Sequence, residues 1–120
     1  MSDINWNTKE KRELVEAILS LKNKDEAERF FRDLMTKQEI DEFSKRLLAA
    51  KMLSQDTQYS AIIEATGLSS TTVARISKWL KGPIGGYRLV LNKISSRSTK
   101  LSASHTHSQN STGKGLPLHS

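Results

Sequence analysis

Residues 59–80 read YSAIIEATGLSSTTVARISKWL, and this stretch decides the fold. Ile62 lies five positions before Gly67, and Val73 and Ile76 follow the glycine by six and nine positions. Two helices that meet at a steep angle need between them a residue with positive φ and no Cβ to collide with the partner helix, and glycine meets both requirements. The spacing therefore predicts a helix-turn-helix over residues 59–80, although an ordinary helical hairpin shares the glycine and the apolar spacing.

The turn residues predict how this motif is held together. Leu68 is expected to pack in the angle between the two helices, and Ser69 or Ser70 is expected to cap the second helix. With Val73 and Ile76 facing inward, a rotation of about 100° per residue leaves the polar positions of the second helix on its outward and flanking faces.

These outward positions suit contact with the groove of a nucleic acid. Small hydroxyl side chains at a helix start allow close approach to phosphates, arginine can bind a guanine edge or a phosphate, and lysines supply point charges. The candidate DNA-contacting residues, two of them from the start of the first helix, are Tyr59, Ser60, Ser69, Ser70, Thr71, Thr72, Ala74, Arg75, Lys78 and Lys81. Each residue alone would suit a solvent-exposed surface equally well, and it is the set that favours DNA.

The charge of the chain is divided unevenly along the sequence. All 13 acidic residues lie at or before Glu64, together with 11 of the 19 lysines and arginines, so residues 1–64 carry a net charge of −2. Residues 65–120 hold the other 8 basic residues and no acidic residue, which gives a net charge of +8. A basic half without acids is typical of a polyanion-binding surface, and the alternative is a basic disordered tail.

Two helices are expected near the N-terminus. Asn7 and Glu10 have the spacing of a helix cap, and Asn23 or Asp25 can begin the second helix. Apolar residues at helical period follow each start. They are Leu14, Val15, Ile18, Leu19 and Leu21 in the first helix, and Ala27, Phe30, Phe31, Leu34 and Met35 in the second.

The third helix is expected to be the central one. A capping box, Thr36-Lys37-Gln38-Glu39, begins it, and it spans residues 37–55. Its apolar residues occupy two neighbouring faces, with Ile40, Phe43, Leu47 and Ala50 on one and Leu48 and Met52 on the other. Because a helix apolar on two sides is typically covered on both, we expect one face to contact its own subunit and the other a second subunit.

The C-terminal part is expected to hold one further helix and a tail. The glycines of residues 82–86 form a hinge, and a helix over residues 86–95 then places Tyr87, Val90, Leu91 and Ile94 on one face. From residue 96 the chain is rich in Ser, Thr, His, Gly and Lys. This composition predicts a helical domain over residues 1–95 and a disordered basic tail over residues 96–120.

The composition also limits the classes of function. The chain has no cysteine, which excludes disulfides and thiolate zinc sites, and His105 and His107 lack a third metal ligand. No run of about 18 apolar residues and no secretion signal is present, so we expect a cytoplasmic protein without a membrane segment. No nucleophile cluster, phosphate-binding loop or close pair of carboxylates indicates an enzyme, and no cofactor is expected.

Several segments together resemble the Trp repressor superfamily. They are residues 34–39 (LMTKQE), Arg46, residues 62–67 and residues 72–75 (TVAR), in the same order and at similar spacing, within a resemblance that covers residues 27–94. The sequence is still more similar to Trp-repressor-related proteins of the YerC/YecD type, which share the KQEI start and the GLSSTTV turn. The resemblance implies an all-α subunit of six helices that is intertwined with a second copy in a homodimer. Two recognition helices would then face successive major grooves of double-stranded DNA.

The resemblance also implies an effector site. Arg46 and Arg75 match the two arginines that bracket tryptophan in the Trp repressor. Ile76 and Trp79 stand where the Trp repressor has a glycine and a serine, so these larger side chains are expected to fill the slot for the indole ring. We therefore expect that tryptophan is not the effector, and that Arg46 either binds a different small anion or pairs with an acidic neighbour.

The sequence thus predicts a sequence-specific, DNA-binding transcription regulator, and the resemblance implies repression. The alternative is a helical protein-interaction module that does not read DNA directly. A basic helix would also tolerate RNA.

Overall fold

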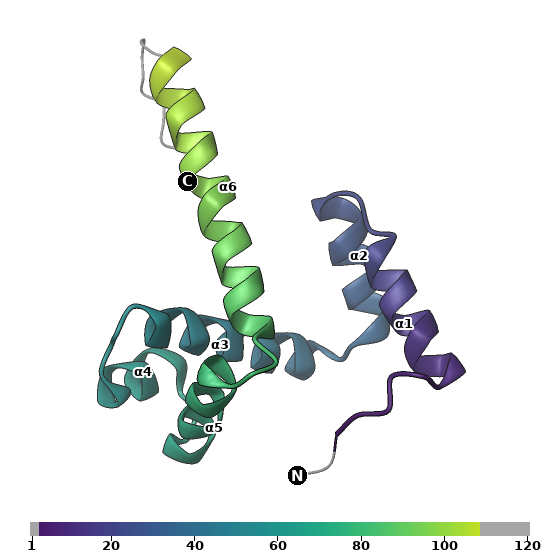
Figure 1. The fold of residues 1–120 in the computed structure, drawn as a ribbon, viewed down its shortest axis with the longest axis horizontal. Helices are drawn as coiled ribbons and strands as arrows, with labels where there is room; N and C mark the ends of the chain where they lie inside the picture. The colour runs from purple at the N-terminus through teal and green to yellow at the C-terminus, as the bar shows by residue number, and fades with distance from the viewer. Residues whose placement is uncertain (1–2, 109–120) are drawn as a thin grey trace. The chain divides into compact units, whose positions relative to one another are not determined.

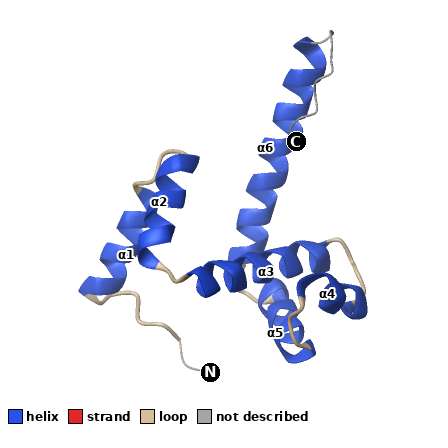
Figure 2. Cartoon of the chain, turned by 180° about the vertical axis from the view of Figure 1, so that it is seen from behind, coloured by secondary structure: helices blue, strands red, loops and turns tan. Residues whose placement is uncertain are grey.

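The computed structural model describes residues 3–108, and the regular elements within that range are all helices (Figure 1). They are α1 (Lys9–Leu19), α2 (Lys24–Leu34), α3 (Lys37–Ser54), α4 (Tyr59–Thr66), α5 (Ser70–Lys81) and α6 (Gly86–Ser108). Seen from behind in Figure 2, the described residues contain no strand. The predicted all-α class with six helices is therefore confirmed. The described residues divide into two compact units, one that ends at Ser44 and one that begins at Lys45.

Side-chain caps begin the first two helices. The Thr8 hydroxyl accepts a hydrogen bond from the Lys11 backbone N–H at 3.3 Å, and the Asn23 side chain accepts one from the Glu26 N–H at 2.9 Å. Asn23 confirms the predicted start of α2. The predicted start of α1 is wrong by one residue, because the cap is Thr8 and the Asn7 N–H is instead bound by a neighbouring asparagine side chain.

The capping box predicted at the start of α3 is confirmed in both directions. The Thr36 backbone N–H donates to Glu39 Oε1 at 2.9 Å, and the Glu39 N–H donates to Thr36 Oγ1 at 3.0 Å. Amides at a helix start have no partner within the helix, so this reciprocal pair satisfies two of them. α3 ends at Ser54, one residue before the predicted end.

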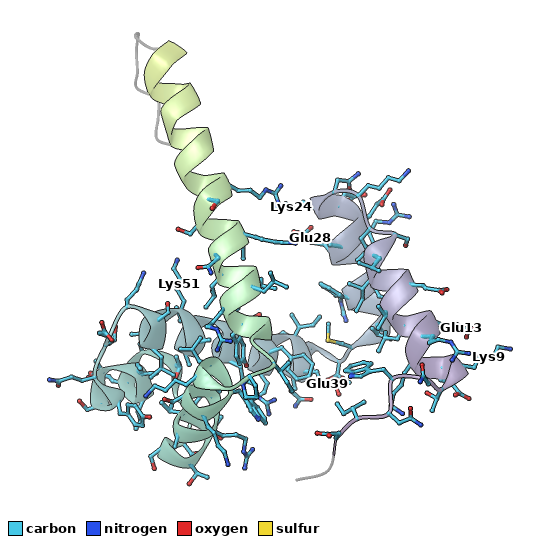
Figure 3. The ribbon with its side chains drawn as sticks, viewed as in Figure 1. Lys9, Glu13, Lys24, Glu28, Glu39 and Lys51 are labelled. Atoms are coloured by element: carbon cyan, nitrogen blue, oxygen red, sulfur yellow. The ribbon has the colours of Figure 1, made fainter. Side chains whose placement is uncertain are left out.

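The N-terminal unit leaves most apolar side chains of α1 exposed, whereas Phe30 and Phe31 of α2 are partly buried. No residue of α1 or α2 is buried, although both helices carry apolar residues at helical period. The exposed ones include Leu14, Val15, Ile18 and Leu19 of α1 and Leu34 of α2. Surface ion pairs in this unit join Lys24 to Glu28 (Figure 3), Arg29 to Asp25 and Lys37 to Asp41. Because exposed pairs contribute little to stability, these ion pairs do not make up for the absence of a fully buried residue in α1 and α2.

The buried core lies in the C-terminal unit. Ile62, Val73 and Ile76 are fully buried, as predicted for the inward faces of the helix-turn-helix. Leu68 is only 6% exposed and joins the same cluster, as predicted for the residue in the angle between α4 and α5. Ala49 and Ala50 of α3 complete the cluster, and Met52, Leu53, Ile63, Tyr87 and Leu91 pack against it. This core holds the helix-turn-helix against the second half of α3 and the start of α6.

The last helix is longer than predicted. α6 continues to Ser108, whereas the sequence predicts a helix that ends at residue 95 and disorder from residue 96. No proline or glycine lies between Tyr87 and Ser108, so nothing in the backbone stops the helix where the composition changes. In both views α6 extends away from α4 and α5 (Figures 1 and 2). The rest of the predicted tail, residues 109–120, lies outside the described residues.

Candidate nucleic-acid interface

The turn between α4 and α5 depends on the backbone of Gly67. Gly67 has a φ of +74°, and its N–H donates to the Ile63 carbonyl at 2.8 Å, which closes α4. A Cβ added at Gly67 would meet no atom within 4 Å. The left-handed conformation expected of this glycine is confirmed, whereas the expected collision of a Cβ with the partner helix is wrong, because the space beside Gly67 is open.

Thr66 stabilises the same turn, and sequence reasoning missed it. Its buried hydroxyl donates to the Ile62 carbonyl at 2.8 Å and accepts a hydrogen bond from the Leu68 N–H at 3.2 Å. A threonine directly before the turn glycine is the signal that could have identified it, because hydroxyl side chains often satisfy amides just beyond a helix end. Together with Gly67, Thr66 fixes the point at which the chain enters α5.

Ser69 is the residue that caps α5. Its hydroxyl accepts a hydrogen bond from the Thr72 N–H at 3.1 Å and donates to the Thr72 hydroxyl at 3.0 Å. Ser70, the other predicted cap, is the first residue of the helix itself. The hydroxyls of Ser69 and Thr72 thus hold the helix start, whereas the Ser70 and Thr71 hydroxyls make no hydrogen bond within the described part of the chain.

The outward face of α5 is accessible, as predicted. Among the ten candidate residues only Thr72 is partly buried, while Tyr59, Ser60, Ser69, Ser70, Thr71, Ala74, Arg75, Lys78 and Lys81 are exposed. The opposite face carries the buried residues Val73, Ile76, Ser77 and Leu80. Across residues 3–108, no acidic side chain forms an ion pair with Arg75, Lys78 or Lys81. α5 therefore presents small hydroxyls at its start and three cations along its length.

The start of α4 contributes less to this surface. Tyr59 is 42% exposed and Ser60 follows it at the first turn of the helix. The α4 cap residue, Gln58, makes no side-chain hydrogen bond to the helix. The backbone amides at this helix start are therefore not satisfied by the cap, and they are suitable donors to an anion.

The residues of the predicted effector site lie in different environments. Arg46 of α3 is partly buried, and its charge lies close enough to the Tyr87 phenol of α6 to affect that group. Burial raises the pKa of Tyr87 and Arg46 lowers it, with burial the larger effect. Ile76 is fully buried, whereas Trp79 is 39% exposed and Arg75 is exposed on α5. Of the two residues expected to fill the indole slot, only Ile76 is in the core.

Other kinds of site find little support among the described residues. Within residues 3–108, no group of three or more His, Asp or Glu side chains is arranged to hold a metal ion. No helix in that range is both long and apolar enough to cross a membrane.

An all-α chain whose buried core supports a glycine-linked helix pair, with a basic second helix exposed, belongs to the class of helix-turn-helix proteins. Comparison with known families then specifies the class. The family model for the Trp repressor protein matches residues 9–95. The chain belongs to the Trp repressor family.

Relatives agree with this assignment. The chain is 36% identical to YerC, an uncharacterized protein of Bacillus subtilis, over 95 aligned residues. The alignment covers 79% of this chain and 91% of YerC. A TrpR-like protein from Eubacterium eligens has a similar solved structure, with a TM-score of 0.70 and 40% identity over 75% of this chain and 93% of the other. A candidate Trp repressor from Staphylococcus aureus matches with a TM-score of 0.66 and 37% identity, over 70% of this chain and 84% of the other. The predicted Trp-repressor-like fold and the similarity to the YerC type are confirmed.

The family also defines the general function. Trp repressor proteins are DNA-binding transcription regulators and not enzymes, so the chain is a member of a regulator family without catalytic activity.

Proposed function

We propose that this protein is a sequence-specific transcription repressor that binds double-stranded DNA as a homodimer, with α5 in the major groove. The observation that carries the proposal is the exposed face of α5. Arg75, Lys78 and Lys81 are exposed there without an ion pair in the described residues, on a helix whose other face is buried. No acidic residue follows Glu64, so nothing later in the chain neutralises this face.

Each residue of this face has a distinct role in the proposal. Arg75 is the residue that can form two parallel hydrogen bonds to a guanine edge. Ser70 and Thr71, at the helix start, donate to phosphates together with the free amides there. Lys78 and Lys81 neutralise backbone phosphates without reading sequence. Ser69 and Thr72 stabilise the start of α5 through the hydrogen bonds of their hydroxyls, and so fix the position of the exposed face.

The proposal includes a homodimer because both units expose apolar side chains. In the N-terminal unit these are the residues of α1 described above. In the C-terminal unit they include Leu47 and Leu48 of α3, which are 39% and 43% exposed, and Val90 and Ile94 of α6, which are 45% and 47% exposed. Contiguous exposed apolar residues on helices of a small domain indicate an interface with another chain. A second copy is the partner that would pair two recognition helices on a two-fold operator.

Free tryptophan is not part of the proposed mechanism. Fully buried Ile76 takes space that a glycine would leave open, which supports the exclusion. Titration calorimetry should therefore show no binding of tryptophan in the micromolar range, and clear micromolar binding would contradict this part of the proposal. Whether Arg46 binds another small anion stays a prediction.

The experiment that tests the proposal measures binding of the full chain to DNA by fluorescence anisotropy. Duplexes recovered from a random pool should bind with an affinity that falls steeply as salt is added. The double variant Arg75→Ala with Lys78→Ala should lose this binding and flatten the salt dependence, by about 0.9 in log–log slope for each phosphate contact removed. A reporter promoter that overlaps the recovered sequence should be silenced by the wild-type protein.

A matched control uses a lysine away from this face. Lys51 is exposed on α3 and extends on the side opposite to α4 and α5 (Figure 3). Lys51→Ala should leave DNA binding unchanged. If Lys51→Ala weakened DNA binding as much as the double variant of Arg75 and Lys78, the loss would follow from the lower net charge and not from the face of α5. No binding of the wild-type protein to any duplex would favour a protein-interaction module that does not read DNA.

A further inference from the structure

A single side chain closes the loop between α5 and α6. Arg88, in the first turn of α6, donates hydrogen bonds from Nη1 to the carbonyl oxygens of Leu80 and Gly82, the latter at 2.8 Å. These carbonyls lie at the carboxyl end of α5, where no further amide of the helix can reach them. A guanidinium at this point also faces the negative end of the helix dipole. The contact is therefore stabilised both by charge-assisted hydrogen bonds and by the attraction of the cation to the dipole.

Gly85 provides the space that Arg88 occupies. It has a φ of +73°, and a Cβ added there would lie 2.6 Å from Nη2 of Arg88. Because the guanidinium is the end of a flexible side chain, an alanine at this position would push it off the two carbonyls. Gly86, the next residue, has open space around it. The segment that the sequence predicts to be a hinge is therefore clamped by Arg88.

The clamp acts at the carboxyl end of α5, where Leu80 is buried and the chain then turns into α6. Val73 and Ile76 anchor the middle of the helix, and α5 packs against α4 and α6. Lys78 and Lys81 lie in the last turn, beside the carbonyls that Arg88 binds. Recognition of base edges requires side chains placed to within about 0.5 Å. A mobile helix end would therefore lower the preference of the protein for one DNA sequence over another.

We propose that Arg88 is a positioning residue for DNA recognition: by joining the carboxyl end of α5 to the start of α6, it sets the orientation in which α5 enters the groove. This inference rests on the proposed DNA-binding function. It differs from a direct phosphate contact, because Nη1 of Arg88 is engaged on two backbone carbonyls. Both hydrogen bonds leave the single nitrogen Nη1. Arg88→Lys keeps the charge but places its nitrogen one bond nearer the backbone, short of the two carbonyls, so this substitution distinguishes the two roles.

The test compares Arg88→Lys and Arg88→Met in the full chain with Lys93→Met, which removes an exposed cation from the same helix. The probes are one duplex recovered from a random pool by the wild-type protein and one random-sequence duplex of equal length. Arg88→Lys and Arg88→Met should each weaken binding to the recovered duplex about tenfold. Binding of Arg88→Lys to the random duplex should change by less than about threefold, with an unchanged salt slope.

Gly85→Ala supplies a second variant that leaves Arg88 in place. It should reproduce the loss of binding to the recovered duplex, whereas Gly86→Ala should not. If Arg88→Lys binds both duplexes like the wild type while Arg88→Met weakens both equally, Arg88 acts by charge alone and the inference is overturned. A reduced melting temperature with parallel losses on both duplexes would overturn it as well, because the role would then be only structural.

Amide hydrogen exchange tests the clamp without DNA. In Arg88→Lys, amides of residues 78–82 should exchange faster while those of α4 keep their protection, since only the end of α5 is released. Unchanged exchange at residues 78–82 would contradict the clamp. If exchange responds as expected but the wild-type protein binds no duplex, the proposed function fails and the positioning role in recognition fails with it, whereas the local contact stands.

Discussion

The two pairs of neighbouring helices in this chain, α1 with α2 and α4 with α5, are stabilised in opposite ways. α4 and α5 are short, yet between them they contain three fully buried apolar residues and a turn closed by Gly67 and Thr66. α1 and α2 are of similar length and are well capped, yet neither contains a buried residue. Helix caps alone therefore do not distinguish a self-supporting helix pair from one that needs a partner.

This difference separates two functions within one small chain. The helix-turn-helix carries its own core, so its outward face can remain polar and accessible. The N-terminal helices keep much of their apolar surface exposed, most of it on α1, and amphipathic helices gain most of their stability from packing such faces. We expect these faces to be covered in the proposed dimer, which predicts that substitutions in the two regions have different consequences.

The largest effect is expected from opening the core below α5. Ile76→Ala should lower the free energy of unfolding by about 2–5 kcal/mol, because the methylenes removed leave a cavity among fully buried neighbours. Urea denaturation monitored by circular dichroism measures the change. Ile84 is 91% exposed, so Ile84→Ala should cost less than about 0.5 kcal/mol. Equal costs for the two isoleucines would contradict the assigned core.

A substitution on α1 should instead change the association of subunits. Ile18→Asn introduces a polar group on the apolar face of α1 and should raise the dissociation constant of the dimer at least about tenfold. Sedimentation equilibrium measures this constant. Glu13, also on α1, is exposed, and Glu13→Asn should leave it unchanged. A protein that is monomeric before any substitution would show that these faces serve another purpose.

A smaller effect is expected from the turn glycine. Gly67→Ala should cost about 1–2 kcal/mol, because alanine resists the left-handed conformation although no atom obstructs its Cβ. Thermal melting reports this cost as a lower Tm. Gly86 has the same open space but no positive φ, so Gly86→Ala should be neutral or slightly stabilising. A neutral Gly67→Ala would mean that the turn relaxes into a different conformation.

The smallest effect concerns pH. Because the pKa of Tyr87 is raised above its ordinary value of 10.0, the folded state holds this proton more tightly than the unfolded state. Stability from Tyr87 is therefore complete below that value and declines as the pH rises through it. Melting curves between about pH 8 and pH 11 should show a steeper decline for the wild type than for Tyr87→Phe. Parallel declines would show that Tyr87 makes no contribution.

Local signals predicted most of the fold because the residues that carry them act on their immediate neighbours. The Thr36–Glu39 box, the Ser69 cap and the Gly67 turn each work within four residues, and each is where the sequence places it. The extent of α6 was not predictable from composition, since a serine-rich segment without proline or glycine is compatible with either helix or disorder. Composition lowers helical preference, but it does not forbid the helix.

For the candidate interface too, the sequence predicted the local features and missed a contact between two helices. Helical periodicity is enough to place Arg75 and Lys78 outward and Val73 inward. The role of Arg88 could not be predicted, because its partners are backbone carbonyls and carry no sequence signal. The hydrogen bonds of Thr66 are local and did have a sequence signal, the threonine directly before the turn glycine. The contact of Arg88, which joins two helices, becomes visible only when the fold brings α5 and α6 together.

The most direct test of the central claim, that α5 presents a DNA-reading face, is to record amide resonances of the full chain while a recovered duplex is added. We expect the largest shifts on the outward residues of α5, from Ser70 to Lys78, with smaller shifts at the start of α4. Little change is expected at α1 and α2. Shifts concentrated on α1 and α2, with α5 unaffected at saturating DNA, would contradict this claim.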